Sequence, residues 1–190
     1  MARQTSRASF ERKHRDAPGP PRWHQRRNER KDDMMTYKIS GLSPDLFVPL
    51  FAMDDAELAA NKARRITATA DRGWPCRISL EDAKAGEELI LLHHVSHDVE
   101  TPFRSAYAIY VRQGVETATF CDALPPAFAG RTMAFRGFGD DGMLVAAKLV
   151  PGEDGDAAIR SLFADPAIAY IHAQYATNGC FAARIERDEP

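Results

Sequence analysis

Cys76 and Arg77 are adjacent, and together they are the residues of this sequence best suited to nucleophilic chemistry. A neighbouring guanidinium lowers the pKa of a thiol, and the thiolate is the reactive form of cysteine. The alternative is that Cys76 is buried and acts as a small hydrophobic residue. Neighbouring side chains on a strand point to opposite faces, so the guanidinium of Arg77 is not expected to reach the sulfur of Cys76. Burial would also raise the thiol pKa, and we therefore expect Cys76 to react slowly in the folded protein. A thiol-dependent enzyme that uses Cys76 is therefore a third hypothesis, behind two others.

His172 is the other candidate for catalysis. It lies in an apolar run on a predicted strand, where a polar ring needs a hydrogen-bond partner. The alternative is a structural histidine whose hydrogen bonds are satisfied. A turn over 177–179 would pair residues near 172 with residues near 183, so Cys180 lies too near the turn to form a dyad with His172. No known catalytic or nucleotide-binding motif is present, and the sequence predicts no particular reaction.

Three arginines, Arg77, Arg104 and Arg112, lie in or beside predicted strands of an acidic region. A planar guanidinium recognises carboxylates and phosphates through paired hydrogen bonds. The alternative is that these arginines form ion pairs which fix a loop, with the acidic residues nearest in the sequence, Asp71, Glu81 and Asp82.

The leading hypothesis is a pocket in which Arg77, Arg104 and Tyr107 bind a small anionic molecule. It would form where the turn at 74–77 meets the loop at 103–104 and the strand at 107–112. The second hypothesis is a non-enzymatic module that engages a protein partner through its surface. A concave pocket that holds Arg77 and Arg104 would favour the first, and a flat exposed apolar patch the second.

His93, His94 and His97 suggest a metal site at first sight. On a strand, however, His93 and His94 point to opposite faces, and the spacing does not indicate a helix. We expect these histidines to end a strand and to open a polar loop that runs to Pro102. The sequence therefore predicts neither a metal site nor a cofactor.

The elements that position these residues centre on the stretch from Asp71 to Leu92. Gly73 permits a bend and Pro75 disfavours helix at Trp74, so Asp71, Gly73, Trp74 and Pro75 are predicted to form a structural turn. This turn delivers Cys76 and Arg77 to an extended segment. Gly86 is suited to a positive φ, and the apolar residues 89–92 predict a buried strand on which the rest packs.

Elsewhere the pattern predicts a sheet with about three helices. The hairpin signals are the clearest, at 131–138 with 143–150 and at 167–176 with 181–187. Further strands are expected at 37–40, 64–70, 105–112 and 115–120, with helices at 43–50, 54–63 and 154–163. Ser43 is predicted to cap the first of these helices, and Asp54-Asp55 the second. Because strands predominate and few helices separate them, the prediction is an α+β fold with a predominantly antiparallel, curved sheet.

Composition gives the general class. The chain has 190 residues, of which 44% are hydrophobic, and three cysteines without paired spacing. These features predict a soluble, cytoplasmic protein with one domain over residues 34–190 and no membrane segment. Residues 1–33 have ten Arg and Lys against five Asp and Glu, a net charge of +5, and are predicted to be a disordered basic extension. The whole chain has a net charge of −2, so the residues after 33 have a net charge of −7. This acidic character makes nucleic acid an unlikely partner for the domain.

Three groups of residues resemble a bacterial family known as domain of unknown function 1203. They are Asp71–Arg77 with Leu80–Ala83 and Gly86-Glu87; Thr101–Arg104 with Tyr107–Arg112; and Tyr170–His172 with Gly179–Phe181 and Glu186-Arg187. The resemblance extends from about residue 37 to the C-terminus. The family has no assigned activity, so the resemblance implies a fold unit and candidate positions but no function.

Overall fold

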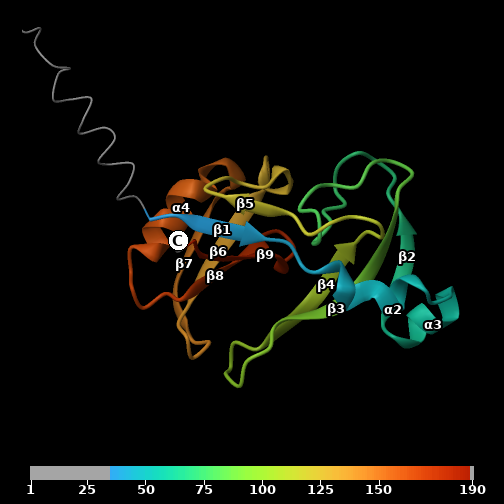
Figure 1. The fold of residues 1–190 in the computed structure, drawn as a ribbon, viewed down its shortest axis with the longest axis horizontal. Helices are drawn as coiled ribbons and strands as arrows, with labels where there is room; N and C mark the ends of the chain where they lie inside the picture. Colours follow the sequence, from blue (N-terminus) through green and yellow to red (C-terminus); the bar gives the residue numbers. More distant parts are fainter. Residues whose placement is uncertain (1–34, 189–190) are drawn as a thin grey trace, which may run out of the picture. The chain divides into compact units, whose positions relative to one another are not determined.

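The computed structural model describes residues 35–188, and in that part the chain is an α+β protein with two antiparallel sheets (Figure 1). The larger sheet has six strands in the order β5-β1-β9-β8-β6-β7. These strands are β1 (Tyr37–Ser40), β5 (Thr119–Cys121), β6 (Thr132–Phe138), β7 (Leu144–Pro151), β8 (Tyr170–Tyr175) and β9 (Cys180–Arg187). Both predicted hairpins are confirmed, since β6 pairs with β7 and β8 with β9.

The core of the larger sheet forms against helix α4 (Gly155–Phe163), which carries its apolar residues on the face toward the sheet. Ile159 and Phe163 of this helix pack with buried side chains such as Phe135, Ile171 and Ile185. The short helix η3 (Gly152–Asp154) leads from β7 into α4, and η2 (Pro126–Phe128) supplies Phe128 to the same core. The burial of these side chains is the main source of stability for this layer.

The smaller sheet has three strands in the order β2-β3-β4: β2 (Ala63–Thr67), β3 (Glu88–His97) and β4 (Ser105–Val111). The helices η1 (Pro44–Phe47), α2 (Val48–Phe51) and α3 (Asp55–Ala60) pack on one face of it. Ser43 caps η1 and Asp54 caps α3, as the sequence predicts, and Asp54 and Glu57 form a reciprocal capping box. Within the described residues, the α-helices α2, α3 and α4 confirm the prediction of about three helices.

The prediction of one curved sheet is wrong, since the described residues form two sheets. The segment after Cys76, predicted to be extended, is a loop and not a strand. Cys76 makes only an isolated parallel bridge to Tyr110, and the chain then turns at Leu80, whose φ is 54°. This loop lies between the two sheets. It is held from the other side by the end of β1, where the backbone N–H of Leu42 donates to the carbonyl of Arg77 at 2.7 Å.

Gly41 permits this close approach. A Cβ atom at position 41 would lie 2.0 Å from the carbonyl oxygen of Ile78, a distance that no side chain tolerates. The N–H of Gly41 donates to the carbonyl of Ala118 at 2.9 Å, which secures the same contact. Gly41 therefore joins the larger sheet to the loop that carries Arg77.

The histidines after Leu92 do not end the strand. β3 continues through His97, because β4 pairs with it along its whole length, with a bulge between Val95 and His97. His97 is 3% exposed and not part of a polar loop. The predicted extension, residues 1–33, lies outside the described residues. Within 35–188, no helix is both long and apolar enough to span a membrane.

Candidate functional site

A cavity of about 570 Å³ lies between the loop that carries Arg77, the strand β4 and the ends of β6, β8 and β9. Each wall comes from a different part of the chain, which sequence spacing alone does not bring together. The side chains with polar groups in its lining include Arg77, Arg131, Tyr107, Tyr110, Tyr175 and Cys180.

Arg77 is only 2% exposed, yet it forms no ion pair with any described residue. Its Nε donates to the carbonyl of Phe181 at 2.7 Å, and one terminal nitrogen donates to the carbonyl of Pro75. The other donates to Sγ of Cys180 at 3.1 Å. The guanidinium also lies 4.9 Å from the centre of the Tyr175 ring. None of these partners is a carboxylate, so among the described residues the positive charge of Arg77 is stabilised by two carbonyl dipoles, a sulfur atom and a ring face.

Arg131 is the second guanidinium in the lining, 5.4 Å from the centre of the same Tyr175 ring. It pairs with Asp82 at 2.7 Å and donates to the carbonyl of Ala127 at 2.6 Å. Burial raises the pKa of Tyr175 to about 12, against the opposing effect of the two guanidinium charges. The phenol is therefore neutral at physiological pH.

No aspartate or glutamate lines this cavity in the described part of the chain. Arg77 therefore gives the lining an uncompensated positive charge, while Arg131 is paired with Asp82 just outside it. Hydroxyl and amide groups of Thr132, Thr177 and Asn178 add neutral hydrogen-bonding capacity. The arrangement is suited to a small molecule with a negative charge.

The predicted ligand-binding residues are only partly brought together. Arg77 and Tyr107 both line the cavity, and Tyr107 is 52% exposed. Arg104 does not line it. It lies in the loop between β3 and β4 and pairs with Asp98 at 2.8 Å, with its side chain 55% exposed. The expected convergence of Arg104 with Arg77 is therefore wrong. β3 continues to His97, beyond the predicted 89–92, so the loop that carries Arg104 begins farther along the chain and lies outside the cavity.

Cys76 and His172, the two candidate catalytic residues, lie in separate clusters. Cys76 is 1% exposed and packs with Ile78 and Ile109 in the core of the smaller sheet. Its Sγ accepts hydrogen bonds from the backbone N–H groups of Ile78 and Arg112, at 3.4 and 3.3 Å. It does not line the cavity, so this thiol is placed as a structural one.

His172 belongs to a buried group of rings with His97, Phe138, Tyr170 and Phe181. His97 is satisfied on both nitrogens: Nδ1 lies 2.9 Å from the carbonyl of Phe103, and Nε2 lies 2.8 Å from the Tyr170 hydroxyl. Because a carbonyl only accepts, Nδ1 of His97 donates to the carbonyl of Phe103. Nδ1 of His172, in contrast, is buried without a hydrogen-bond partner among the described residues.

The pKa of His172 is lowered to about 3, mainly by burial and in smaller part by the electrostatic effects of His97 and Arg184. His172 is therefore neutral at physiological pH. Its cross-strand partner is Arg184, and Cys180 pairs with Tyr175 instead. The register thus confirms that Cys180 and His172 form no dyad.

The predicted turn before Cys76 is held by carboxylates. Oδ1 of Asp82 accepts from the N–H groups of Gly73 and Trp74, at 3.1 and 2.9 Å. Oδ1 of Asp71 accepts from the N–H of Ala85 at 2.9 Å. Gly73 has a φ of 108°, which a residue with a side chain rarely adopts. Asp82, which also pairs with Arg131, therefore connects the turn to the cavity wall.

Arg112, the third predicted arginine, is structural. It pairs with Glu87 at 2.6 Å and donates to the Ser79 hydroxyl at 2.9 Å. Burial alone would lower the pKa of Arg112, but the hydrogen bond that Arg112 donates to Glu87 and further charge interactions outweigh this effect, and the pKa is raised. An ion pair was the expected alternative for these arginines, although the partner is Glu87 and not one of the three predicted acids.

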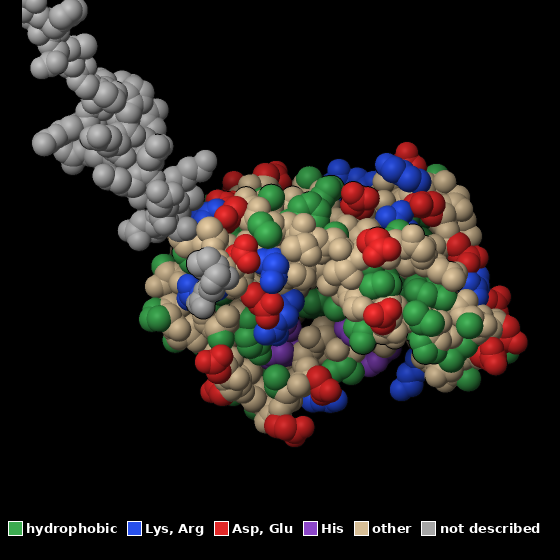
Figure 2. All heavy atoms as spheres, in the orientation of Figure 1, with side chains coloured by type: hydrophobic (Ala, Val, Ile, Leu, Met, Phe, Trp, Pro, Cys, Tyr) green, Lys and Arg blue, Asp and Glu red, His purple; other side chains and the backbone are tan. Residues whose placement is uncertain are grey.

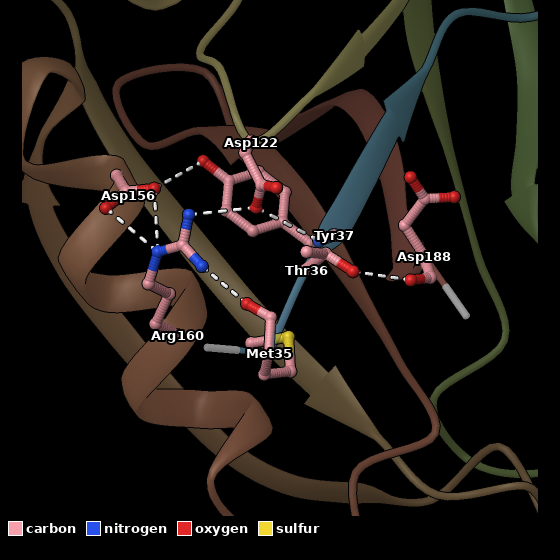
Figure 3. Close-up of polar contacts among 7 residues, drawn as sticks. All are labelled: Met35, Thr36, Tyr37, Asp122, Asp156, Arg160 and Asp188. Carbon is pink, nitrogen blue, oxygen red and sulfur yellow. Dashed lines mark hydrogen bonds and ion pairs between the residues drawn. The ribbon is translucent and has the colours of Figure 1, made fainter. Parts of the chain in front are cut away.

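A second polar cluster lies at the start of β1, around Arg160 of α4 (Figure 3). Nε of Arg160 contacts both oxygens of Asp156 at 3.1 Å, and a terminal nitrogen donates to Asp122 at 2.8 Å. The Tyr37 hydroxyl donates to Asp156 at 2.8 Å. Burial alone would raise the pKa of Asp156, but the hydrogen bonds from Arg160 and Tyr37 outweigh it and hold that pKa below its ordinary value. This cluster joins β1 to α4.

Sequence reasoning missed Arg131 and Tyr175 and assigned Cys180 no role. Arg131 begins a predicted hairpin strand, and Tyr175 ends one, so both are visible only as ordinary strand residues. The usable signal is the turn at 177–179, which places Tyr175 opposite Cys180. Within residues 35–188, no three or more His, Cys, Asp or Glu side chains gather as metal ligands would.

The fold and the cavity define an α+β protein in which two antiparallel sheets meet at an arginine-bearing pocket. The chain matches a family described as "Protein of unknown function (DUF1203)" over residues 73–187, more than half of its length. The chain belongs to this family, which confirms the resemblance seen in the sequence, although the match begins at residue 73 and not near 37. No curated protein and no solved structure matches the chain.

Proposed function

We propose that this protein binds a small organic anion in the cavity lined by Arg77 and Arg131. The observation that carries the proposal is the charge of Arg77, which is 2% exposed and has no acidic partner among the described residues. A buried charge is costly unless it is paired, and an arginine does not escape this cost by releasing its proton. An anion in the cavity would supply the missing negative charge.

The geometry leaves Arg77 able to contact such a ligand. Its three hydrogen bonds do not use all the N–H groups of the guanidinium. These contacts also fix the orientation of the side chain before any ligand binds, which lowers the entropic cost of binding. Tyr107 and Asn178 at the cavity wall supply further donors. A carboxylate is the anion that best fits a planar guanidinium beside hydroxyl groups.

Isothermal titration calorimetry and thermal shift with short monocarboxylates and inorganic phosphate test the proposal. A ligand that binds only the folded state raises the melting temperature by mass action. We expect Arg131→Gln and Tyr107→Ala to weaken binding, by about tenfold for the arginine. Arg104→Gln is the matched control and should leave binding unchanged. Absence of binding by every anion, or an equal loss with the control variant, would overturn the proposal.

The alternative is a non-enzymatic module that binds a protein partner. It is favoured by a group of exposed apolar side chains over η1 and α2, where Leu46 is 60% and Val48 is 58% exposed (Figure 2). A Leu46→Ser, Val48→Ser double variant distinguishes the two functions. Loss of self-association or of partner capture in this variant, together with no response of the wild type to anions, would favour the interaction module.

A cytoplasmic location in a bacterium completes the proposal. It is supported by the three cysteines, all of which are free. Free thiols are typical of reducing compartments. Fractionation of cells that produce the tagged protein tests this location.

A further inference from the structure

A second cavity, of about 590 Å³, adjoins the first on the same sheet. It lies over β2 and β3, and its lining includes the basic side chains Lys62, Arg64 and Arg65 together with His93. Leu91 and Ala108 line both cavities. The two cavities therefore share an apolar wall, and each has arginines on the side away from it.

The strand register places Arg64 and Arg77 at the two ends of one row. Arg64 is opposite Leu91, Leu91 is opposite Tyr110, and the N–H of Arg77 donates to the carbonyl of Tyr110 at 2.9 Å. Three strand spacings separate the backbones at the two ends of this row, which gives a span of about 14 Å. Cys76 packs in the core on the helix-covered face, whereas the side chain of Arg77 lines the first cavity together with Leu91 and Tyr110.

The arginines that line the two cavities differ in whether an acidic side chain balances their charge. Arg65 is committed to Glu88 at 2.7 Å and to Asp55 at 3.5 Å. Arg64 is exposed and, like Arg77, forms no ion pair within residues 35–188. Asp55 is the one acidic side chain in the lining of the second cavity, and it faces Arg65. Among the described residues, a guanidinium without an acidic partner thus lies at each end of the row, with Leu91 between them.

We propose that the ligand is an elongated dianion with an apolar middle, one end of which binds Arg77 and Arg131 and the other Arg64. This inference rests on the proposed function and adds the shape and charge of the ligand. The half-buried Leu91 and the small side chain of Ala108 form a low wall over which a hydrocarbon segment packs. A straight-chain dicarboxylate has this chemistry.

Calorimetric titration of the full chain tests it, with straight-chain dicarboxylates from succinate to dodecanedioate beside the monocarboxylate of the same carbon number. We expect one range of chain lengths in which the dicarboxylate binds about tenfold more tightly than its monocarboxylate. Arg64→Ala should remove this advantage and leave monocarboxylate binding unchanged. Ala108→Trp, which raises the shared wall, should weaken the long dicarboxylates and spare succinate. Arg136→Ala, an exposed arginine outside both cavities, is the matched control.

The outcomes separate the two proposals. If monocarboxylates and dicarboxylates bind equally at every length, or if Arg64→Ala acts no differently from Arg136→Ala, the elongated dianion is wrong and the anion pocket stands. If neither series binds, the proposed function itself is wrong. Circular dichroism of each variant shows whether it is folded, and because Arg64 and Ala108 are exposed, their substitution is not expected to disturb the core.

Discussion

Arg160 and Arg77 are both largely withdrawn from water, but their surroundings differ. Arg160 contacts two carboxylates, of Asp122 and Asp156, and so its charge is balanced within the chain. Arg77 contacts two carbonyls, a thiol and a ring face, and no carboxylate. The first arrangement is complete in itself, while the second leaves a positive charge that an added anion would balance. Charge compensation thus separates a structural arginine from one available to a ligand.

His172 shows the third way in which a buried basic group is accommodated. Like Arg77, it has no acidic partner among the described residues, and its Nδ1 has no hydrogen bond. A histidine, however, releases its proton, and the pKa of about 3 shows that burial drives it to the neutral form. Arginine does not have this option in a protein. The same absence of a partner therefore indicates a ligand for Arg77 but not for His172.

The largest expected effect concerns Gly41, which joins the two regions. β1 begins at Tyr37 in the Arg160 cluster and ends against the loop of Arg77. Gly41→Ala places a Cβ against the carbonyl of Ile78 and should cost about 3 kcal/mol or more of stability in urea unfolding. Gly114→Ala is the control. Position 114 has open space around it, so only its positive φ costs energy, about 1–2 kcal/mol. Equal losses would show that β1 does not hold this loop.

Replacing Arg160 or Arg77 with methionine tests whether the two arginines differ in charge compensation. Arg160→Met leaves two acids without their partner and should cost about 2–3 kcal/mol, less than for a fully buried pair because Asp156 is partly exposed. Arg77→Met loses hydrogen bonds but also removes an uncompensated charge, so its cost should be nearer 1 kcal/mol. Chemical denaturation measures both. A larger loss for Arg77→Met would mark Arg77 as structural and weaken the case for a ligand.

Acid should destabilise the protein through His172. Its folded pKa of about 3 lies below the ordinary value of 6.5, so the unfolded chain takes up a proton first as the pH falls. The free energy of unfolding should therefore drop by about 2 kcal/mol from this group between pH 7 and pH 5. His172→Phe should flatten that part of the profile, while His93→Phe, at an exposed position, should not. Profiles that stay parallel for wild type and His172→Phe would contradict the neutral buried state.

The smallest effect is a difference in thiol labelling. Cys180 lines the cavity beside Arg77, whereas Cys76 is enclosed in the core of the smaller sheet. In a Cys121→Ser background, iodoacetamide should label Cys180 roughly tenfold faster than Cys76, which reacts only on unfolding. Octanoate should slow the labelling of Cys180 alone, as peptide mass spectrometry would show. Equal protection of both thiols would point to general stabilisation and not to a bound ligand.

Local chemistry was enough to predict the elements whose signals are short-range. The Gly139–Gly142 turn, the cap at Asp54 and the helix at 155–163 follow from residues within one turn of each other. The extended segment predicted after Cys76 was wrong for the opposite reason. The chain turns at Leu80, whose φ is 54°, and the loop is held by contacts with the end of β1 and with β4, which are distant in the sequence.

The site was harder to predict, because its partners are distant in sequence. Arg77 meets Phe181 and Cys180 across more than 100 residues, and no spacing rule brings them together. Tyr107 was predicted because β4 has a strong strand pattern beside the turn. Arg104 was misplaced because β3 pairs with β4 as far as His97, a residue whose ring contacts the Tyr170 hydroxyl, which lies in the other sheet and far from His97 in the sequence.

The shared wall at Leu91 and Ala108 divides the proposed site along the chain as well as in space. All residues that line the first cavity fall within the 73–187 segment that defines the family, whereas Arg64 and the other basic residues of the second cavity precede it. A protein that shares only this segment inherits the anion pocket without the far end. Ligand length is thus a separable property, and exchanging residues 55–65 between such proteins should transfer the preference for long or short ligands.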